Sequence, residues 1–547
     1  MPTIEISKKD LEMLLGKKLS NEELQERAMP FVKSDIEDIQ EDLLKVEIKD
    51  TNRPDLLSVE GIARELQGFY GIKKGVPKFK VKKSDVKVTV DPKLTNIRPK
   101  GAYAIAKNVK VTEHLLKQMI QLQEKICETF GRKRKEIAIG LFDYDKVCGN
   151  LRYYAADPKT KFVPLDFSEE LSLDEIIKQH PKGQEYGRLL RDYEKYPLLV
   201  DEKGEVLSMP PIINSEYSGK VTTNTRNLFV DVTGFDQKTI NTALDIICAA
   251  LHDRGAKIES VIVEYKDKKI ITPMLGTKRI SVASDLIENI AGMEFRKEDI
   301  KKYASMKRMD CSLKNKAFEF KYCSYRADIM HAVDIIEDIL IAADYNKIRP
   351  AQVQVPSKGS ELPLRSHITA LREACIGLGL QEVLTFTLTS KERQSTNVML
   401  PEEGLVELEN PLSTEYAVFR RSILPELLAV LSRNKHREYP HKIFEVGKVA
   451  LKKSSGNEEF VEEKELVSIA ISHSKADFNE IKAIFDSICC AMGYKYKVEK
   501  IEHESFEKGL CARALIGGKS AIFGVLRKEV LKNFNLDMPV VALEMGI

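Results

Sequence analysis

The chain has 547 residues, of which 43% are hydrophobic and 31% charged, so it is globular rather than disordered and too long for a single core. Its 86 basic and 83 acidic residues leave a net charge of only +3, which excludes a basic field over the whole surface and leaves room only for a local nucleic-acid patch. The nine cysteines form no CxxC pair, so neither a zinc site nor a disulfide framework is predicted, and no apolar run of about 18 residues predicts a membrane span.

The first 71 residues predict a mixed α/β unit. Helices are expected at 7–15 and 58–68, a strand at 46–48, and a polar turn at 50–56. A stretch rich in Lys, Gly and Pro at 71–84 then indicates a linker, and therefore a first domain boundary.

Residues 86–265 predict one domain of mixed sheet with helical cover. Strand patterns recur up to 261–265, with helices expected at 112–130 and 239–255. The basic loop 131–136 is either a contact for nucleic-acid phosphates or a solvated loop. A long polar section, from about 142 to 205, follows.

A third unit is expected from about residue 272, with a strand followed by a helix at 280–292 and an acidic helix near its end. The remaining chain, 351–547, alternates predicted helices with predicted strands. The helices are expected at 366–379, 424–434 and 479–492, and the strands at 383–387, 442–446, 465–471 and 540–544.

The acidic helix is the most distinctive local pattern. Asp334, Glu337 and Asp338 fall at i, i+3 and i+4, which puts three carboxylates on one face, and Asp328 precedes them in the approaching turn. No Lys or Arg lies between Asp328 and Asp344. Carboxylates gathered in this way are typical either of a solvated helix face or of a site for a hard divalent cation such as Mg²⁺.

Five segments occur together and in order, and they span essentially the whole chain. They are DTNRPDLLSVEGIAREL at 50–66, SMPPIINSEY at 208–217, NLFVDVTG at 227–234, SYRADI and VDIIEDI within 324–339, and FRRSILPELLAVLSRN at 419–434. With these segments the chain resembles the β subunits of phenylalanyl-tRNA synthetases of the archaeal and eukaryotic cytosolic type.

The resemblance implies an α+β multidomain fold with four parts. These are an N-terminal α/β unit (1–84), a mixed-sheet editing domain (85–268), a small winged-helix-like α+β domain (269–347) and a class II synthetase-like antiparallel core (348–547). Neither the tRNA-binding barrel nor the separate anticodon-binding domain of the bacterial proteins is visible in the sequence, so the resemblance does not extend to anticodon recognition.

For the acidic helix, the resemblance implies that Asp328, Asp334, Glu337 and Asp338 hold Mg²⁺. Such an ion is expected to be structural rather than catalytic, because the site lies away from the aminoacylation pocket. A solvated face remains the alternative, and a stand-alone Mg²⁺-dependent phosphotransferase remains a rival function.

The resemblance also implies an editing pocket formed by Leu199, Ser208, Asp231 and Thr233. An apolar pocket rejects the extra hydroxyl of tyrosine only modestly, so a second site with polar side chains is needed to select the mischarged product. No Ser-His-Asp or Cys-His arrangement is apparent near these residues, and we therefore expect a positioned water as the nucleophile. Asp231 and Ser208 have alternative interpretations as a strand-end carboxylate and a turn residue.

The resemblance further implies an α2β2 complex that uses ATP as a substrate, binds tRNA(Phe) and is cytoplasmic, with the aminoacylation site in the α subunit. The C-terminal core of this chain is expected to be catalytically empty, since its Arg residues do not match the class II pattern. A tRNA-binding scaffold without editing activity is the alternative function.

Overall fold

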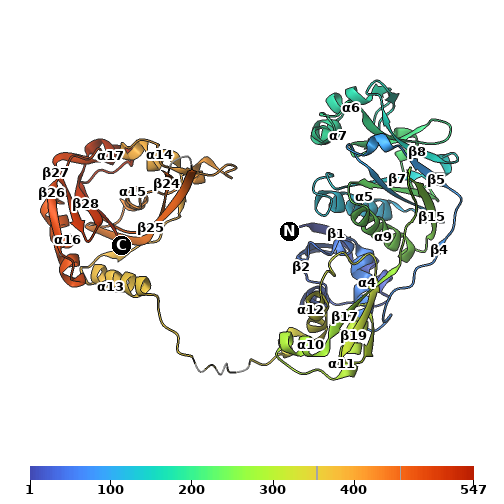
Figure 1. Cartoon of the computed structure of the whole chain (residues 1–547), viewed down its shortest axis with the longest axis horizontal. Coiled ribbons are helices and arrows are strands. Elements are labelled where there is room, and N and C mark those ends of the chain that lie inside the picture. Colours follow the sequence, from blue (N-terminus) through green and yellow to red (C-terminus); the bar gives the residue numbers. More distant parts are fainter. Residues whose placement is uncertain (351, 353–354, 356, 456–457) are drawn as a thin grey trace. The chain divides into compact units, whose positions relative to one another are not determined.

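The structure is a computed structural model, and it describes the chain except for residues 351, 353–354, 356 and 456–457 (Figure 1). Two compact units are distinguished, 1–351 and 352–547. None of the helices in the described part of the chain is both long and apolar enough to cross a membrane.

The first unit begins with a small module of sheet and helices, called the N-terminal module below. Its antiparallel sheet has the order β1-β3-β2. The main elements are β1 (Thr3–Ser7), α1 (Lys8–Leu15), α3 (Met29–Phe31), β2 (Ser34–Gln40), β3 (Leu43–Ile48), the 3₁₀ turn η2 (Pro54–Leu56) and α4 (Val59–Phe69). Ser7 and Ser58 cap α1 and α4 by accepting hydrogen bonds from the backbone N–H groups of Asp10 and Gly61, which explains where these helices start.

A large mixed sheet follows, with the strand path β13-β12-β11-β8-β5-β15-β6-β14-β7. Its strands are β5 (Lys87–Val90), β6 (Lys100–Lys107), β7 (Ile137–Asp143), β8 (Leu151–Ala156), β11 (Tyr196–Val200), β12 (Val206–Met209), β13 (Ile213–Asn214), β14 (Leu228–Gly234) and β15 (Lys257–Glu264). Helices α5 (Glu113–Glu128) and α9 (Gln237–Asp253) cover one face, as Figure 1 shows.

The two faces of β14 have different roles. Val230 and Val232 pack in the core that α9 closes, whereas Phe229 points into a second core on the other face. Because strand side chains alternate, Asp231 and Thr233 share the face of Phe229. Two polar side chains are thus placed on an otherwise apolar sheet face.

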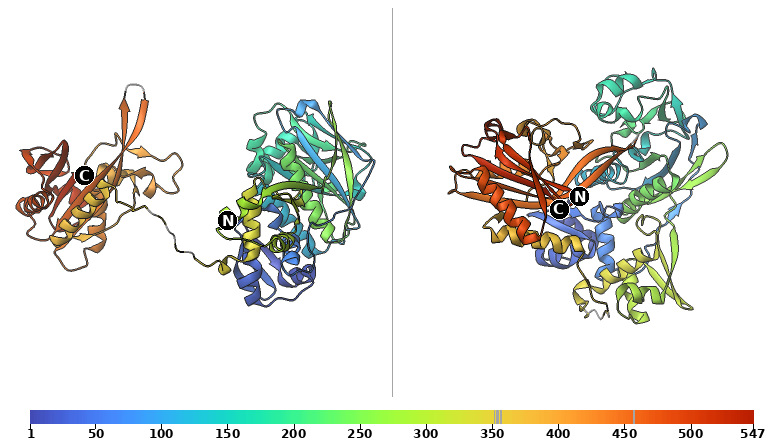
Figure 2. Two further views of the ribbon diagram at one scale, coloured as in Figure 1. Left: turned by 60° about the horizontal axis from the view of Figure 1, so that its bottom comes forward. Right: turned by 60° about the vertical axis from the view of Figure 1, so that its left-hand side comes forward.

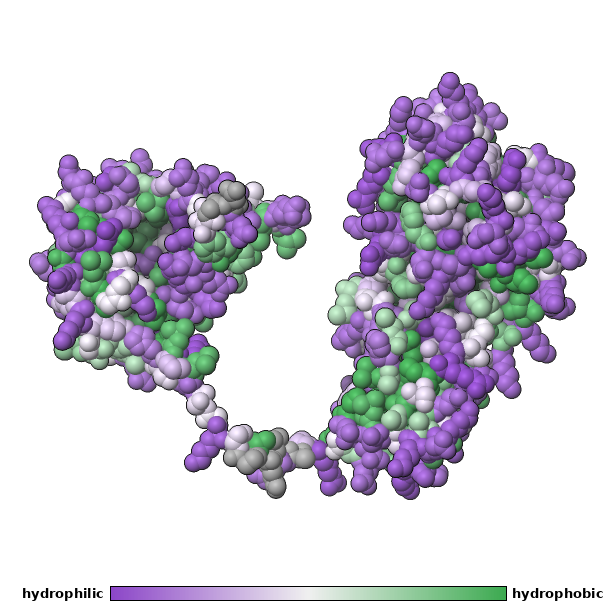
Figure 3. All heavy atoms as spheres, in the orientation of Figure 1, coloured by the Kyte–Doolittle hydropathy of each residue, from purple (hydrophilic) through white to green (hydrophobic). Residues whose placement is uncertain are grey.

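The third segment of the first unit has a three-stranded sheet of order β17-β19-β18 and three helices. These elements are β17 (Thr277–Ala283), α10 (Ser284–Ala291), α11 (Lys297–Met306), β18 (Asp310–Lys314), β19 (Ala317–Cys323) and α12 (Ala332–Ala343). Ile335, Ile336 and Ile339 of α12 are fully buried in its core. The face in Figure 3 is mostly hydrophilic, with an apolar area over α10 and α12.

The second unit is built on a seven-stranded sheet of order β20-β24-β25-β29-β28-β27-β26. Its strands are β20 (Gln381–Glu382), β24 (His441–Ser455), β25 (Glu458–Ser472), β26 (Tyr496–Lys500), β27 (Phe506–Ile516), β28 (Lys519–Leu526) and β29 (Val540–Gly546). Helices α13 (Pro363–Gly377) and α16 (Phe478–Met492) pack in one core, and α15 (Leu424–Asn434) and α17 (Lys528–Asn533) in another. The β24–β25 hairpin projects beyond the rest of this unit (Figure 2).

The predicted α+β multidomain class is confirmed. Two expectations differ from the structure. The expected strand at 383–387 is not a strand and lies between the short strands β20 and β21 (Leu388–Thr389). β24 and β25 are far longer than expected because their charged outer halves pair with each other. The polar section 142–205, for which no elements were specified, contains β8, β11, α6 (Leu173–Gln179) and α7 (Pro181–Tyr186).

Candidate functional site

A cavity of about 170 Å³ opens where the two ends of the large strand path come together. Gly140 of β7 lines one side, and Ser208 of β12 and Asn214 of β13 line the other. The Asn214 side chain donates to the carbonyl of Leu141 across this junction (3.5 Å). Strands at opposite ends of the sheet path therefore contribute to the same site.

Asp231 and Ser208 provide the polar groups at this cavity. Each side chain is 2% exposed, and neither Asp231 Oδ1 nor Ser208 Oγ has a hydrogen-bond partner among the described residues. Burial raises the pKa of Asp231 to about 7, against the opposing effect of the Arg98 charge. Unpartnered buried polar atoms beside a cavity are expected where a polar ligand or water binds.

Gly140 leaves space next to Asp231. It pairs with Asp231 in the β7–β14 register, so a side chain at position 140 would project from the same face. A Cβ there would lie 2.7 Å from the Phe142 ring and 3.3 Å from Asn214 Oδ1. The absence of a side chain at this position keeps the cavity open beside the carboxyl group.

Leu199 and Thr233 lie next to the cavity but do not line it. Leu199 is paired with Ser208 in the β11–β12 register, and Thr233 follows Asp231 by two residues on β14. Arg98, which is 2% exposed, donates from Nε to Thr233 Oγ1 at 2.9 Å. The structure thus brings all four predicted residues together, with Ser208 and Asp231 at the cavity surface.

Two cavity residues were not singled out from the sequence. Arg134 belongs to the basic loop, yet it is only 9% exposed, and it donates to the carbonyl of Ile212 and to Glu124 at 2.9 and 2.7 Å. His180 has both ring nitrogens occupied by backbone partners, the carbonyl of Leu165 at 3.1 Å and the N–H of Lys182 at 3.1 Å. His180 is therefore not available as a base for Ser208. The only sequence signal for Arg134 was its place in a run of four basic residues.

The acidic helix differs from its sequence-based description. Asp338 is buried at 3% exposure and lies within 2.6 Å of Arg326, whereas the Glu337 side chain is 52% exposed and pairs with Lys33 at 2.8 Å. Asp334 accepts hydrogen bonds from the backbone N–H groups that precede α12. The absence of Lys and Arg between Asp328 and Asp344 is thus offset by Arg326, which lies just before this stretch, and by Lys33 from another segment.

These four carboxylates do not fit a divalent cation in this arrangement. Both oxygens of Asp328 accept hydrogen bonds from Arg326, at 2.8 and 2.5 Å. No group of three or more His, Cys, Asp or Glu within the described residues is arranged to hold a metal. The Mg²⁺ site stays a prediction that this geometry does not support.

Four protein-family models match successive parts of the chain. They are the "Phe-tRNA synthetase beta subunit B1 domain" at 1–72, the "B3/4 domain" at 110–249, the "tRNA synthetase B5 domain" at 280–345 and the "Phenylalanyl tRNA synthetase beta chain CLM domain" at 348–547. Curated relatives named phenylalanine–tRNA ligase β subunit align over the whole chain. The relative from Pyrococcus horikoshii is 44% identical over 100% of this chain and 98% of its own length, and the one from Pyrococcus furiosus is 45% identical over 100% and 99%.

The chain belongs to the phenylalanine–tRNA ligase β subunit family. A solved N-terminal fragment of the P. horikoshii phenylalanyl-tRNA synthetase β subunit is 48% identical, covers 63% of this chain and 100% of its own, and superposes with a TM-score of 0.62. The chain is accordingly an aminoacyl-tRNA synthetase subunit. The cavity residues Ser208 and Asp231 fall within the B3/4 match, and α12 falls within the B5 match.

Proposed function

We propose that this chain, as the β subunit of an α2β2 phenylalanine–tRNA ligase, hydrolyses tyrosyl-tRNA(Phe) at the cavity beside Asp231. The observation that carries the proposal is the pair of buried, unpartnered polar atoms, Asp231 Oδ1 and Ser208 Oγ, at a cavity of 170 Å³. This volume is below the roughly 300–1,000 Å³ of pockets for drug-sized ligands. It therefore suits a single amino-acid side chain.

The two polar atoms supply selectivity. The hydroxyl of a tyrosyl group would pair with Asp231 or Ser208, whereas a phenylalanyl group would leave both without a partner. An unpartnered buried polar group costs about 1–3 kcal/mol, so correctly charged tRNA is disfavoured at this site. Both ring nitrogens of His180 are bound to backbone groups, which supports attack by a positioned water over a Ser-His nucleophile.

Two arginines of the second unit are bound to groups inside the protein, which supports an aminoacylation site in the α subunit and not in this chain. Arg420 is 3% exposed, and its Nη1 donates to Glu445 at 2.7 Å and to Thr385 at 2.8 Å, so its charge is already neutralised inside the protein. Arg527 donates to the carbonyl of Phe506 at 2.8 Å. We therefore place ATP at the α subunit and assign residues 348–547 to a catalytically inactive class II-like core. In the rest of the chain we place domain boundaries after residues 84 and 268. We also propose that the complex is cytoplasmic.

The test is deacylation by the complex of this chain with its α subunit. We expect hydrolysis of tyrosyl-tRNA(Phe) to exceed that of phenylalanyl-tRNA(Phe), and Asp231→Ala and Thr233→Ala to remove most of it while leaving phenylalanylation unchanged. Glu169→Ala is the matched control, because Glu169 is an exposed carboxylate in the same large-sheet part of the chain as Asp231. Equal deacylation by the wild type and Asp231→Ala would favour the alternative, a tRNA-binding scaffold without editing.

A further inference from the structure

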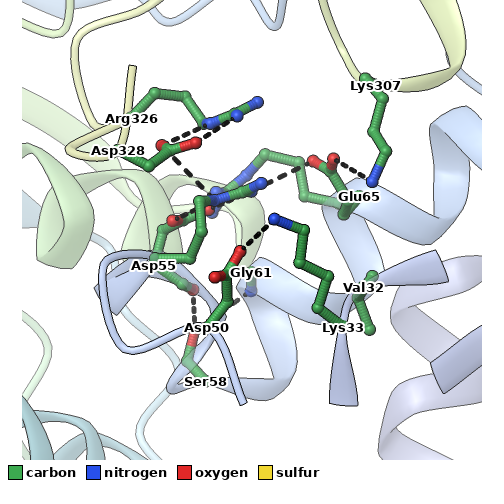
Figure 4. Close-up of polar contacts among 12 residues, drawn as sticks. Val32, Lys33, Asp50, Asp55, Ser58, Gly61, Glu65, Lys307, Arg326 and Asp328 are labelled. Carbon is green, nitrogen blue, oxygen red and sulfur yellow. Dashed lines mark hydrogen bonds and ion pairs between the residues drawn. The ribbon is translucent and has the colours of Figure 1, made fainter. Parts of the chain in front are cut away.

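A buried ionic cluster joins the N-terminal module to the third segment of the first unit (Figure 4). It consists of three basic and four acidic side chains, each at most 10% exposed. The members are Arg53, Asp55, Glu65, Lys307, Arg326, Asp328 and Asp338. Two of the four carboxylates predicted to hold Mg²⁺, Asp328 and Asp338, belong to this buried ionic cluster.

Arg326 occupies the position between these two carboxylates. Its Nε and Nη2 donate to the two oxygens of Asp328 at 2.8 and 2.5 Å, and Nη2 also lies 2.6 Å from Asp338 Oδ2. Burial would raise the pKa of Asp338, but the charges of Arg326 and Lys307 outweigh burial and hold that pKa well below its usual range. The guanidinium therefore provides the positive charge that a metal ion was predicted to provide.

The N-terminal module contributes the other half of the cluster. Arg53 forms a two-pronged pair with Asp55 at 2.9 and 2.8 Å, and its Nε lies 3.8 Å from Asp328 Oδ1. Lys307, at the end of α11, donates to the carbonyl of Phe31 at 2.8 Å and lies 4.0 Å from Glu65 Oε1. Each part thus contributes a basic side chain that contacts acidic or carbonyl groups of the other part.

The ion pairs argue against an added divalent ion. Three cations, Arg53, Arg326 and Lys307, contact the four carboxylates. Both oxygens of Asp328 are already bound by Arg326, so a divalent ion would have to displace this guanidinium and leave a buried charge without its partner.

The other two predicted ligands lie outside the buried ionic cluster and have separate partners. Asp334 Oδ2 accepts from the backbone N–H groups of Met330 and His331 at 2.7 and 2.6 Å, which fixes the start of α12. Glu337 pairs with Lys33 at 2.8 Å, and Lys33 also pairs with Asp50 at 2.8 Å.

We propose that Asp328 and Asp338 serve in this chain as ion-pair partners of Arg326 and Lys307 that clamp the third segment onto the N-terminal module, and that the four carboxylates do not hold Mg²⁺. The proposal concerns structure and does not depend on hydrolysis at the Asp231 cavity. It distinguishes two carboxylates of α12 that a metal site would treat alike, since Asp338 is a clamp residue and Glu337 is a surface residue.

The experiment compares Asp338→Asn with Glu337→Gln in the full-length chain. Thermal unfolding is followed in Mg²⁺ and in EDTA, and Mn²⁺ serves as a probe whose free form is measured by electron paramagnetic resonance. We expect Asp338→Asn to lower the Tm by at least about 5 °C, because it leaves Arg326 and Lys307 with one partner fewer in a buried site. We expect Glu337→Gln to change the Tm by less than about 1 °C, as is usual for exposed pairs. Wild type should have the same Tm in EDTA and Mg²⁺ and bind no stoichiometric Mn²⁺.

A metal site predicts the opposite pattern. Stoichiometric Mn²⁺ binding that both variants abolish, or a wild-type Tm that falls in EDTA, would overturn the proposal. Should Asp338→Asn fail to fold, the wild type and Glu337→Gln still decide: a Mn²⁺ site lost in Glu337→Gln contradicts the proposal, and no Mn²⁺ site in either protein supports it.

Discussion

Arg98 holds Thr233 by two hydrogen bonds, from Nε to Oγ1 at 2.9 Å and from Nη2 to the carbonyl oxygen at 2.6 Å. The remaining terminal nitrogen donates to the carbonyls of Arg134 and Lys135, at 3.3 and 3.1 Å. Arg98 thereby fastens the end of β14, two residues from Asp231, to the loop that precedes β7. We infer that these hydrogen bonds of Arg98 hold Asp231 in its position at the cavity.

If the cavity is the proposed editing site, we expect Arg98→Met to reduce deacylation of tyrosyl-tRNA(Phe) by about tenfold or more, because a small displacement of groups that position a substrate is costly. Urea unfolding should show a loss of about 1–3 kcal/mol, since buried carbonyls lose their donors. Arg98→Lys is the matched variant: it keeps the charge but not the planar fork, and should recover only part of the activity. Unchanged deacylation in Arg98→Met would contradict the positioning role.

The pKa of about 7 at Asp231 predicts a pH dependence of editing. The ionised carboxylate is the stronger hydrogen-bond acceptor, so kcat/KM for tyrosyl-tRNA(Phe) should rise with pH through this value. Asp231→Asn should lack the inflection, since its amide does not titrate. The comparison requires deacylation rates from about pH 5.5 to 8.5, corrected for uncatalysed ester hydrolysis; the same profile in both proteins would rule out Asp231 as the titrating group.

The same pKa shift has a consequence for stability. The folded-state pKa of Asp231 is raised above its usual value near 3.9, so the folded state retains a proton that the unfolded chain loses. Between about pH 4 and 7 the free energy of unfolding should therefore fall as pH rises, by an amount that Asp231→Asn removes. Urea unfolding at pH 5 and pH 7 measures the difference.

Local elements were predictable where the sequence signal is local. The helix expected at 424–434 is α15, and the helix expected at 58–68 is α4, with Ser58 as its cap. In NLFVDVTG the two-residue spacing of Asp231 and Thr233 puts them on one face of a strand, and β14 has this arrangement. In each of these cases the side-chain period lies within the segment itself, and for α4 the capping residue does too.

The sites were predictable only in part, because their partners are distant in sequence. Arg53 lies 275 positions before Asp328 (328 minus 53), and nothing in SYRADI indicates that the N-terminal module reaches it. Arg326 lies two residues before Asp328 in the sequence, but no partner could be assigned to it without the fold. Likewise, Gly140 opens the cavity through strand register, which only the sheet defines.

A second buried ion pair, between Asp10 and Arg254, should contribute strongly to the stability of the first unit. Asp10 of α1 accepts from both terminal nitrogens of Arg254 at 2.6 Å, the two side chains being 7% and 11% exposed, and Arg254 Nε also donates to Glu60 at 2.7 Å. We expect Asp10→Asn to cost about 3–5 kcal/mol of unfolding free energy, the range for breaking a buried pair. Glu185→Gln, which breaks the exposed Lys182–Glu185 pair, is the control and should change stability by about 0.5 kcal/mol or less.

The Asp10 effect should also depend on pH. Burial opposes ionisation of Asp10, but Arg254 and His114 outweigh it and lower the pKa of this carboxyl below its usual value. Its contribution is therefore present above the unfolded pKa near 3.9 and lost as pH falls below it. The stability difference between wild type and Asp10→Asn should shrink below about pH 4, and a constant difference would contradict the ion-pair explanation.

In the second unit, Glu544 of β29 caps a helix that lacks a capping side chain of its own. The N-cap position of α15 is Ile423, and Glu544 Oε2 accepts from the Ser422 hydroxyl and from the N–H groups of Ile423 and Leu424 at 2.9, 2.9 and 3.1 Å. Glu544→Ala would remove the acceptor of the Ile423 N–H and of the Ser422 hydroxyl, and the Leu424 N–H would keep only Ser422 Oγ at 3.2 Å, so we expect a loss of about 1–3 kcal/mol. Glu544→Gln keeps an acceptor oxygen and should lose less. Hydrogen exchange of the first-turn amides of α15 provides the local measurement; exchange that is equally slow in wild type and Glu544→Ala would show that the cap does not hold the helix.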